Sequence, residues 1–268
     1  METAFQNQVL NLEIPLPRPF AWQQPANRSD IGAGQIHIWK VNLDTEKLVE
    51  DQQSILSCGE QQRAARFILQ NKRSWFQAAH CALRKILSGY MNKSPDDIQF
   101  QYGRSGKPYC IQTGRRQGIE FNLAHADHLM LLAVTLGVPV GIDLERHRSI
   151  SAREWIIKQY FSGNDLAAFR NLSAADQDCA FLSAWTAREA CGKLSGNGLA
   201  NPSQTDHLVP GLERALPDSH YETYLMGSSN CMRFNPDAGF SACAAVKSAH
   251  DLQPYFWEFC ELRLGGMD

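Results

Sequence analysis

The feature that most constrains this 268-residue chain is an apolar run from Leu129 to Ile142, which Thr135 and Pro139 interrupt. A membrane-spanning helix needs about 18 or more consecutive apolar residues, so this run is too short and too broken to be one. Its length and its interruption suit buried strands. We therefore predict paired buried strands here, with Met130–Leu136 as the return strand of a hairpin and Val138–Glu145 as the next strand.

Hydrophobic periodicity predicts the other elements. Alternating apolar residues at Ile119, Phe121 and Leu123 are typical of a strand, and apolar residues at helical spacing predict long helices on either side of the strands. The expected strands are at Gln35–Leu43 and through Ile98, Phe100 and Tyr102, with strand-like stretches at Phe240–Val246 and Tyr255–Leu264. A helical region is expected to end with Arg73–Leu87, where Phe76, Ala79, His80, Leu83 and Leu87 share one face. Two more helices are expected: one begins with the capping-box pattern Ser151–Glu154 and runs through Tyr160, and the other spans Ser173–Ser195 and is stopped by Gly196-Asn197-Gly198.

An internal similarity predicts two related halves. Phe76-Gln-Ala-Ala79 in the first long helix is echoed by Phe181-Leu-Ser-Ala184 in the second, about a hundred residues later. Ala133-Val134 and Ala245-Val246 each end a predicted strand. We therefore expect an α+β fold of two similar halves, each a long helix packed on a small antiparallel sheet. The expected divisions are a proline-rich extended arm at 1–34, an N-terminal half at 35–139 and a C-terminal half at 140–268.

Composition narrows the class of protein. Hydrophobic residues make up 44% of the chain, charged residues 20%, and the net charge is -2, so neither nucleic acid nor a membrane surface is the expected partner. The N-terminus has no basic segment followed by an apolar block, so we expect no secretory signal. The eight cysteines include no C-x-x-C pair, which predicts free thiols in a cytoplasmic protein in place of a zinc site.

A pair of acids ends one predicted strand. Asp143 and Glu145 are two residues apart in Gly141-Ile-Asp-Leu-Glu145, so their side chains project from the same face. Two adjacent carboxylates are stabilised by a cation between them, and Mg²⁺ prefers oxygen ligands. The ordinary alternative is a solvated strand end whose acids pair with Arg146 and Arg148. By itself, the spacing favours that alternative.

Another acid and a lysine share a face of the second long helix. Trp185, Glu189 and Lys193 are spaced four residues apart and stack along one side of the helix. The charges on that side must meet a cleft or solvent. A surface Glu–Lys pair that supports the helix by roughly 0.3–0.5 kcal/mol is the ordinary interpretation.

Positive charge is concentrated before the strands. No Asp or Glu occurs between Gln61 and Pro95, which predicts either a phosphate-binding surface or a solvated basic helix. The cations of this segment are Arg63, Arg66, Lys72, Arg73, Arg84, Lys85 and Lys93. The turn Gly103–Pro108 adds two more cations but lacks the P-loop pattern. The spacing of His125, His128 and His147 matches no zinc site, so a hydrogen-bonding role is expected for His125.

The order of four motifs resembles that of a known family. Gly-Lys-Pro at 106–108, Phe-Asn-Leu-Ala-His at 121–125, Gly-Ile-Asp-Leu-Glu at 141–145 and Trp-x-x-x-Glu-Ala-x-x-Lys at 185–193 follow one another along the chain. This arrangement resembles the 4′-phosphopantetheinyl transferases of the large, pseudo-dimeric type that activates peptide and polyketide synthetases. The resemblance spans residues 35 to 250 and implies two related α+β halves with an active-site cleft between them that holds coenzyme A.

The resemblance also implies roles for individual residues. Asp143, Glu145 and Glu189 match the metal-binding acids, for Mg²⁺ or alternatively Mn²⁺, and Asp143, Glu189 and Lys193 match catalytic positions. The positions expected to bind coenzyme A are Lys107, His125, Arg63, Arg73 and Arg188. The implied reaction is attack by a serine of an apo acyl or peptidyl carrier protein on coenzyme A, with release of 3′,5′-ADP and with Glu189 or a metal-bound water as base. A cytoplasmic monomer is implied.

Two departures from the family pattern bear on this expectation. Arg188 stands where the family has lysine, and Ala124-His125-Ala126 replaces Ser-His-Ser, which removes two hydroxyls that could bind phosphate. Both changes concern the binding of coenzyme A. The alternatives are therefore a non-catalytic relative that binds coenzyme A or a carrier protein, and an unrelated metal-dependent phosphohydrolase.

Overall fold

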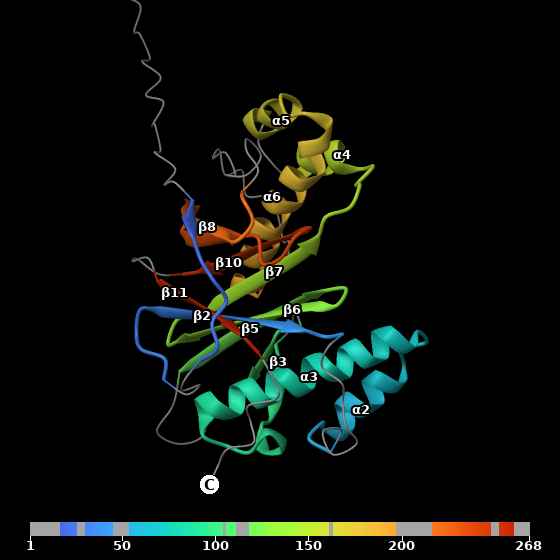
Figure 1. Ribbon diagram of the computed structural model, residues 1–268, viewed down its shortest axis with the longest axis vertical. Coiled ribbons are helices and arrows are strands. Elements are labelled where there is room, and N and C mark those ends of the chain that lie inside the picture. Colours follow the sequence, from blue (N-terminus) through green and yellow to red (C-terminus); the bar gives the residue numbers. More distant parts are fainter. Residues whose placement is uncertain are drawn as a thin grey trace, which may run out of the picture.

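Two β-sheets lie between two long helices in the computed structural model, which describes residues 17–25, 30–44, 54–103, 106–110, 118–160, 163–196, 216–247 and 252–259 (Figure 1). One sheet has the strand order β11-β2-β6-β5, with β2 at Gln35–Asn42, β5 at Ile119–Ala126, β6 at Leu129–Leu136 and β11 at Gln253–Glu258. The other has the order β1-β8-β9-β10-β7, with β1 at Arg18–Pro19, β7 at Val140–Arg146, β8 at His220–Met226, β9 at Ser229–Phe234 and β10 at Phe240–Val246. A separate hairpin pairs β3, Phe100–Tyr102, with β4, Pro108–Cys110.

The helices cover the outer faces of the two sheets. The described helices are α2 at Cys58–Ala65, α3 at Gln70–Met91, α4 at Arg153–Tyr160, α5 at Gly163–Arg170, α6 at Ala174–Ser195 and a 3-10 turn at Pro95–Asp97. Figure 1 shows α3 below the sheet that contains β2, and α6 with α4 and α5 on the opposite side of the molecule.

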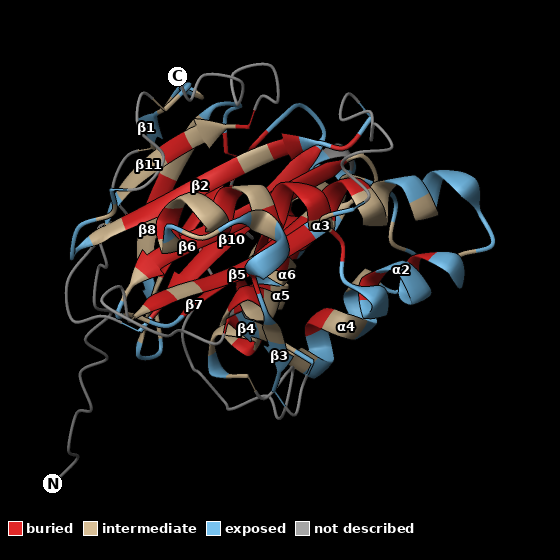
Figure 2. Ribbon diagram, turned by 90° about the horizontal axis from the view of Figure 1, so that it is seen from below, coloured by how far each residue is buried: buried red, intermediate tan, exposed pale blue. Residues whose placement is uncertain are grey.

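Alternation along the strands builds this layered core. On β6, Met130 and Leu132 pack in the cluster with α3, whereas Leu129 and Leu131 face the second sheet. Both sets are buried, which explains why the strand is a continuous apolar run, and Figure 2 shows the central strands as the most buried part of the molecule.

The run Leu129–Ile142 forms two buried strands, as predicted, but they do not pair with each other. Strand β6 pairs with β2 and β5, and β7 pairs with β10. Gly137, with φ of 70°, turns the chain between the sheets, and the Thr135 hydroxyl donates to the carbonyl of Val138. The two interrupting residues of the run therefore mark the change of sheet.

The helix boundaries follow local signals. Helix α6 begins after the N-cap Ser173 and ends at Gly196, whose φ of 71° suits glycine, so both predicted ends are confirmed. The capping box predicted for α4 is not what Glu154 forms, because its carboxylate accepts a hydrogen bond from Arg170 of α5. A complete capping box occurs instead at the start of α2, between Ser57 and Glu60.

The order of elements recurs along the chain. Strand β2, helix α3 and the hairpin β5–β6 are followed by β7, helix α6 and the hairpin β9–β10. In each set the first strand pairs antiparallel with the last, and each helix has 22 residues. The observed architecture is thus a mixed α+β fold with several sheets.

The described part of the predicted arm is extended and packs against the core. Arg18 and Pro19 pair with β8, and the ring of Phe20 stacks on Phe256 with 3.9 Å between centroids. Aromatic residues within the proline-rich segment supply this burial. Residues 1–16 of the arm, 197–198 of the helix stop and 260–264 of the last apolar stretch lie outside the described residues.

Two further expectations concern membranes and thiols. In the part of the chain that the structure describes, no helix combines the length and the apolar character needed to cross a bilayer. Seven cysteines are described and all are free thiols, as predicted. Most are buried or half-buried, although Cys58 is exposed.

Candidate active site

Close packing of α6 on β7 brings the two acidic motifs together. Gly141 has no side chain, and a Cβ atom there would lie 2.0 Å from the carbonyl oxygen of Ala190 and 2.5 Å from the backbone nitrogen of Leu194. Only glycine permits this approach of strand and helix. The alternation of β7 buries Ile142 and Leu144 between the sheets and directs Asp143 and Glu145 to the side on which α6 packs.

Asp143 and Lys193 form the central contact of this junction. The Lys193 Nζ donates to Asp143 Oδ1 at 2.7 Å. Asp143 is only 7% exposed, and its second oxygen, Oδ2, is buried without a hydrogen-bond partner within the described residues. A buried carboxylate oxygen with no donor costs free energy, which marks this position as one where a cation or donor would bind favourably.

Glu189 lies within the electrostatic influence of both acids of β7. Burial raises the pKa of Glu189, the charges of Asp143 and Glu145 raise it further, and Lys193 opposes them. The strand pair and the helix acid are therefore close enough to interact electrostatically. Glu145 accepts a hydrogen bond from Arg148, whose Nη1 lies 2.7 Å from Glu145 Oε2.

The three acids supply the right kind of ligand for a hard divalent cation, but they are not a preassembled site. Within the described residues, no three His, Cys, Asp or Glu side chains are close enough to hold a metal as they stand. Lys193 occupies one oxygen of Asp143. Of the two arginines that the ordinary interpretation named, Arg148 pairs with Glu145, whereas Arg146 pairs with Asp127. The uncompensated Asp143 Oδ2 and the all-oxygen donor set nevertheless fit Mg²⁺.

A cavity of about 400 Å³ opens beside Asp143 and Lys193. Its volume is in the usual range for a ligand site. Cations and aromatic rings dominate its wall, which is formed by Arg63, Phe67, Lys72, Trp75, Phe76, Ala79, His80, Tyr102, Gly106, Pro108, Leu123, Ala124, His125, Asp143 and Lys193. A larger hollow of about 1050 Å³ shares Arg63, Phe67 and Tyr102 with it. Arg63 thus borders both hollows, and the Asp143–Lys193 pair borders the smaller one.

His125 lies in this cavity at the end of β5. Burial lowers the pKa of His125, and the nearby cations Lys193 and Lys72 lower it further. The same cationic surroundings that disfavour a positive charge on the imidazole would favour an anionic ligand. Ala124, which replaces a serine of the family pattern, is buried in the core between the sheets.

Lys107 lies in sequence between two residues that line this cavity. Its Nζ donates to the carbonyl of Val140 at 2.7 Å, and burial lowers its pKa. It borders a smaller hollow of about 340 Å³ together with Ser195 and Gly196 at the end of α6. Its neighbours Gly106 and Pro108 line the cavity of Asp143 and Lys193.

Two of the predicted phosphate-binding cations are placed elsewhere. Arg73 donates to the carbonyl of Phe67 at 3.0 Å and lines a separate hollow with Gln61 and Gln77. Arg188 lies over the ring of Tyr160 on α4, 5.9 Å from its centroid. The structure thus brings Arg63, His125, Asp143 and Lys193 to one cavity, with Glu189 beside it, and leaves Arg73 and Arg188 outside.

Several residues of the cavity wall were not predicted from the sequence to belong to a functional site. Phe76 and His80 were predicted to share a face of α3 with Ala79, Leu83 and Leu87, which are buried. The rings of Phe76 and His80 instead lie in the cavity wall, with 4.2 Å between their centroids. Trp75 also lines the cavity. The signal for them was their position in a segment without acids, where aromatic side chains next to cations are suited to a nucleotide.

Comparison with known proteins agrees with this geometry. A model of the 4′-phosphopantetheinyl transferase superfamily matches residues 139–217, and a model of the 4′-phosphopantetheinyl transferase N-terminal region matches residues 44–136. These two stretches contain α3, β7 and α6.

Individual relatives are similar over most of the chain. The 4′-phosphopantetheinyl transferase HetI of Nostoc sp. is 30% identical over 226 residues, which are 84% of this chain and 92% of the relative. A putative 4′-phosphopantetheinyl transferase of Synechocystis sp., slr0495, is 26% identical over 205 residues, 76% of each chain. The 4′-phosphopantetheinyl transferase psf-1 of Bacillus pumilus is 27% identical over 135 residues, 50% of this chain and 54% of the relative.

Proposed function

The chain belongs to the 4′-phosphopantetheinyl transferase superfamily and is an enzyme that transfers phosphopantetheine from coenzyme A to carrier proteins. We propose that this transfer depends on a divalent metal ion and that Asp143, Glu145 and Glu189 hold it. The supporting observation is the contact of Asp143 with Lys193 at 2.7 Å beside the cavity, within the electrostatic reach of Glu189. Mg²⁺ is the proposed ion and Mn²⁺ an alternative, because both prefer oxygen ligands.

The chemistry is an in-line displacement at phosphorus. When bound, the metal ion would neutralise charge on the pyrophosphate of coenzyme A. A carrier serine hydroxyl loses its proton and forms a bond to the β-phosphorus, while the bond from that phosphorus to the bridging oxygen breaks and 3′,5′-ADP leaves. The base that accepts this proton is proposed to be either Glu189 or a water molecule at the metal site. Lys193 would stabilise the negative charge on the leaving group.

Binding of coenzyme A is assigned to the cationic wall. Arg63 and His125 line the cavity, and Lys107 borders a smaller hollow while its neighbours Gly106 and Pro108 line the cavity. Of the remaining predicted residues, Arg73 and Arg188 are not proposed to contact the coenzyme directly, because the first donates to Phe67 and the second lies over Tyr160. Their proposed role is to position α2 and α4.

The repeated order of elements supports the proposal of two similar halves. They comprise residues 35–139 and 140–268, and the coenzyme would bind in the cleft between them. Both α3 and α6 contribute to the cavity wall, so one chain supplies every proposed site residue. We accordingly propose a monomer that acts in the cytoplasm.

The test is transfer to an apo carrier protein with coenzyme A and Mg²⁺, read by intact mass. Asp143→Asn and Glu189→Gln should each lower the transfer rate by at least about a hundredfold, because each removes a negative charge from the proposed metal site. Glu154→Gln is the matched control, since this exposed acid pairs with Arg170 away from the cavity, and it should transfer normally.

Other outcomes would select the alternatives. Coenzyme A binding by calorimetry without any mass gain on the carrier would indicate a non-catalytic relative. Release of phosphopantetheine without an acceptor would indicate a hydrolase. Full transfer by Asp143→Asn or Glu189→Gln would remove that residue from its proposed role.

A further inference from the structure

Two large apolar side chains are exposed at the corner between α2 and α3. Ile68 is 96% exposed and Leu69 is 60% exposed, although both belong to the apolar sequence Phe67-Ile-Leu69. Phe67 turns inward and packs on Phe76, with 5.4 Å between ring centroids. Ile68 and Leu69 therefore point away from the core, and a partner that covered them would gain free energy by removing their apolar surface from water.

The corner is held in a defined conformation. Arg73 donates to the carbonyl of Phe67 at 3.0 Å, and the backbone nitrogen of Phe67 donates to Ala64 at 3.1 Å. The exposure of Ile68 and Leu69 thus belongs to a fixed turn, so a partner would meet a preorganised surface.

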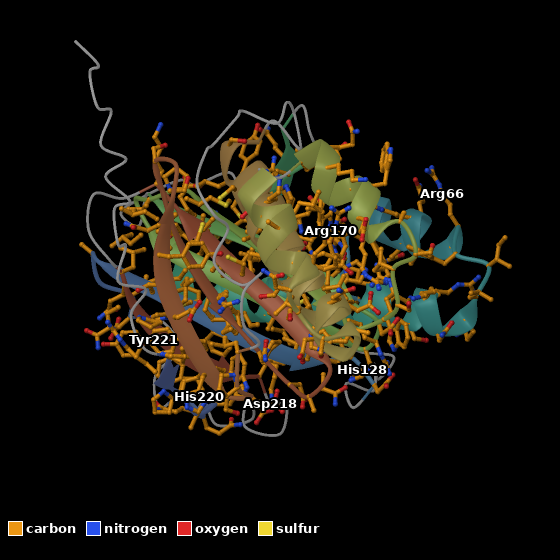
Figure 3. The ribbon with its side chains drawn as sticks, turned by 90° about the horizontal axis from the view of Figure 1, so that it is seen from above. Arg66, His128, Arg170, Asp218, His220 and Tyr221 are labelled. Carbon is orange, nitrogen blue, oxygen red and sulfur yellow. The ribbon has the colours of Figure 1, made fainter. Side chains whose placement is uncertain are left out.

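Positive charge surrounds the exposed pair. Arg63, Arg66 and Lys72 are all exposed on α2, its C-terminus and the first turn of α3. The acid of α2, Glu60, is buried and paired with Arg84 at 2.8 Å, and no other acid occurs from Gln61 to Pro95. Figure 3 shows Arg66 at the outer edge of the molecule with its side chain directed away from the ribbon.

The corner adjoins the proposed active site. Phe67 and Lys72, which flank Ile68 and Leu69, both line the cavity that contains Asp143 and Lys193. A protein seated on the corner would therefore have its own surface next to the position of the reacting phosphate. This proximity is what an acceptor serine requires.

We propose that the α2–α3 corner, defined by Arg66, Ile68, Leu69 and Lys72, is the docking surface for an acidic amphipathic helix of the carrier protein. An apolar side chain of that helix covers Ile68 and Leu69, and its carboxylates face Arg66 and Lys72. The inference rests on the proposed function, because the occupant is the acceptor of the transfer reaction. An acidic partner is favoured because Arg63 and Arg66 are exposed beside the apolar pair, and the described part of the chain from Gln61 to Pro95 contains no acid. Lys72 also lies 3.8 Å from Asp127, whose side chain is 40% exposed.

The test is steady-state transfer with varied carrier and with varied coenzyme A. The double variant Ile68→Ser, Leu69→Ser should raise the KM for the apo carrier by about tenfold or more while leaving the KM for coenzyme A within about twofold. Arg66→Glu should also raise the KM for the carrier, and added salt should weaken wild-type recognition more than that of Arg66→Glu. Leu225→Ser is the control, because Leu225 is 63% exposed on β8 and should change neither constant.

The outcomes separate this inference from the proposed function. Failure of the wild-type protein to modify any carrier would overturn both. Normal wild-type transfer with an unchanged carrier KM in both corner variants would overturn the docking surface alone. Sedimentation of a wild-type dimer that the double variant converts to monomer would also overturn it, since the occupant would then be a second copy of the chain.

Discussion

Gly141 sets the distance between the acids of β7 and the residues of α6. Replacing it with alanine would place a Cβ atom 2.0 Å from the backbone of Ala190, and backbone atoms of a packed helix cannot yield as a flexible side chain does. We expect Gly141→Ala to destabilise the protein by about 1–3 kcal/mol and to lower transfer, because strand and helix must separate. Urea denaturation and intact-mass transfer would measure both effects.

A matched glycine tests this explanation. Gly163 is the first residue of α5, is exposed, and has nothing within 4 Å of a Cβ atom. Gly163→Ala should therefore keep or slightly raise stability, as alanine is the better helix former. Equal effects of the two substitutions would show that the contact with Ala190 is not what requires glycine at 141.

The sequence predicted the placement of some site residues and not of others, for a geometric reason. Spacing of two on a strand put Asp143 and Glu145 on one side, because side chains alternate strictly along a strand. Arg188 is adjacent to Glu189 in sequence, but successive helix residues point about 100° apart. Arg188 therefore faces Tyr160, and a motif match could not show this.

The pairing of α2 with α3 depends on one buried acid. Burial alone would raise the pKa of Glu60, but hydrogen bonds from His80, Arg84 and Ser57 lower this pKa to about 2. A depressed pKa contributes stability above the ordinary pKa of glutamate, and that contribution is lost as the pH falls toward 2. The shift corresponds to about 3 kcal/mol.

Glu60→Gln should accordingly destabilise the protein by about 3–5 kcal/mol near neutral pH, because it leaves the charge of buried Arg84 unpaired. The difference from wild type should shrink between pH 4.5 and pH 2, where wild-type Glu60 becomes protonated. Denaturation at several pH values would measure this. A difference that stays constant with pH would contradict the assignment.

The bounds of helices and strands were predicted more readily than which strands pair with each other. Local signals such as the N-cap Ser173 and the αL residue Gly196 determine where α6 begins and ends, so they can be found in sequence. Strand partners depend on contacts distant in sequence. The paired strands expected from Leu129–Ile142 therefore proved to be neighbours in sequence that pair in different sheets.

The two ends of the chain join opposite sheets. Strand β1, near the N-terminus, pairs with β8, whereas β11, near the C-terminus, runs parallel to β2 with Gln253 opposite Gln35. The sheet of β7–β10 thus gains its last strand from near the N-terminus, and the sheet of β2, β5 and β6 gains its last strand from near the C-terminus. Nothing in local periodicity indicates this exchange, because a parallel pairing of distant strands leaves no short-range pattern.

Phe256 contacts both the arm and the second sheet, so it lies where the two ends of the chain meet. It is 6% exposed on β11 and its ring contacts Phe20 and Trp22 from the arm and Phe234 from β9. Phe256→Ala should lower the free energy of unfolding by about 3–5 kcal/mol, since it opens a cavity where both sheets and the arm meet. Because both sheets share this cluster, circular dichroism and tryptophan fluorescence should report one coincident transition at lower denaturant in the variant. Leu225→Ala, at an exposed position on β8, is the control and should leave the midpoint unchanged. If the transitions measured by circular dichroism and by fluorescence occurred at different denaturant concentrations in Phe256→Ala, the two sheets would unfold independently.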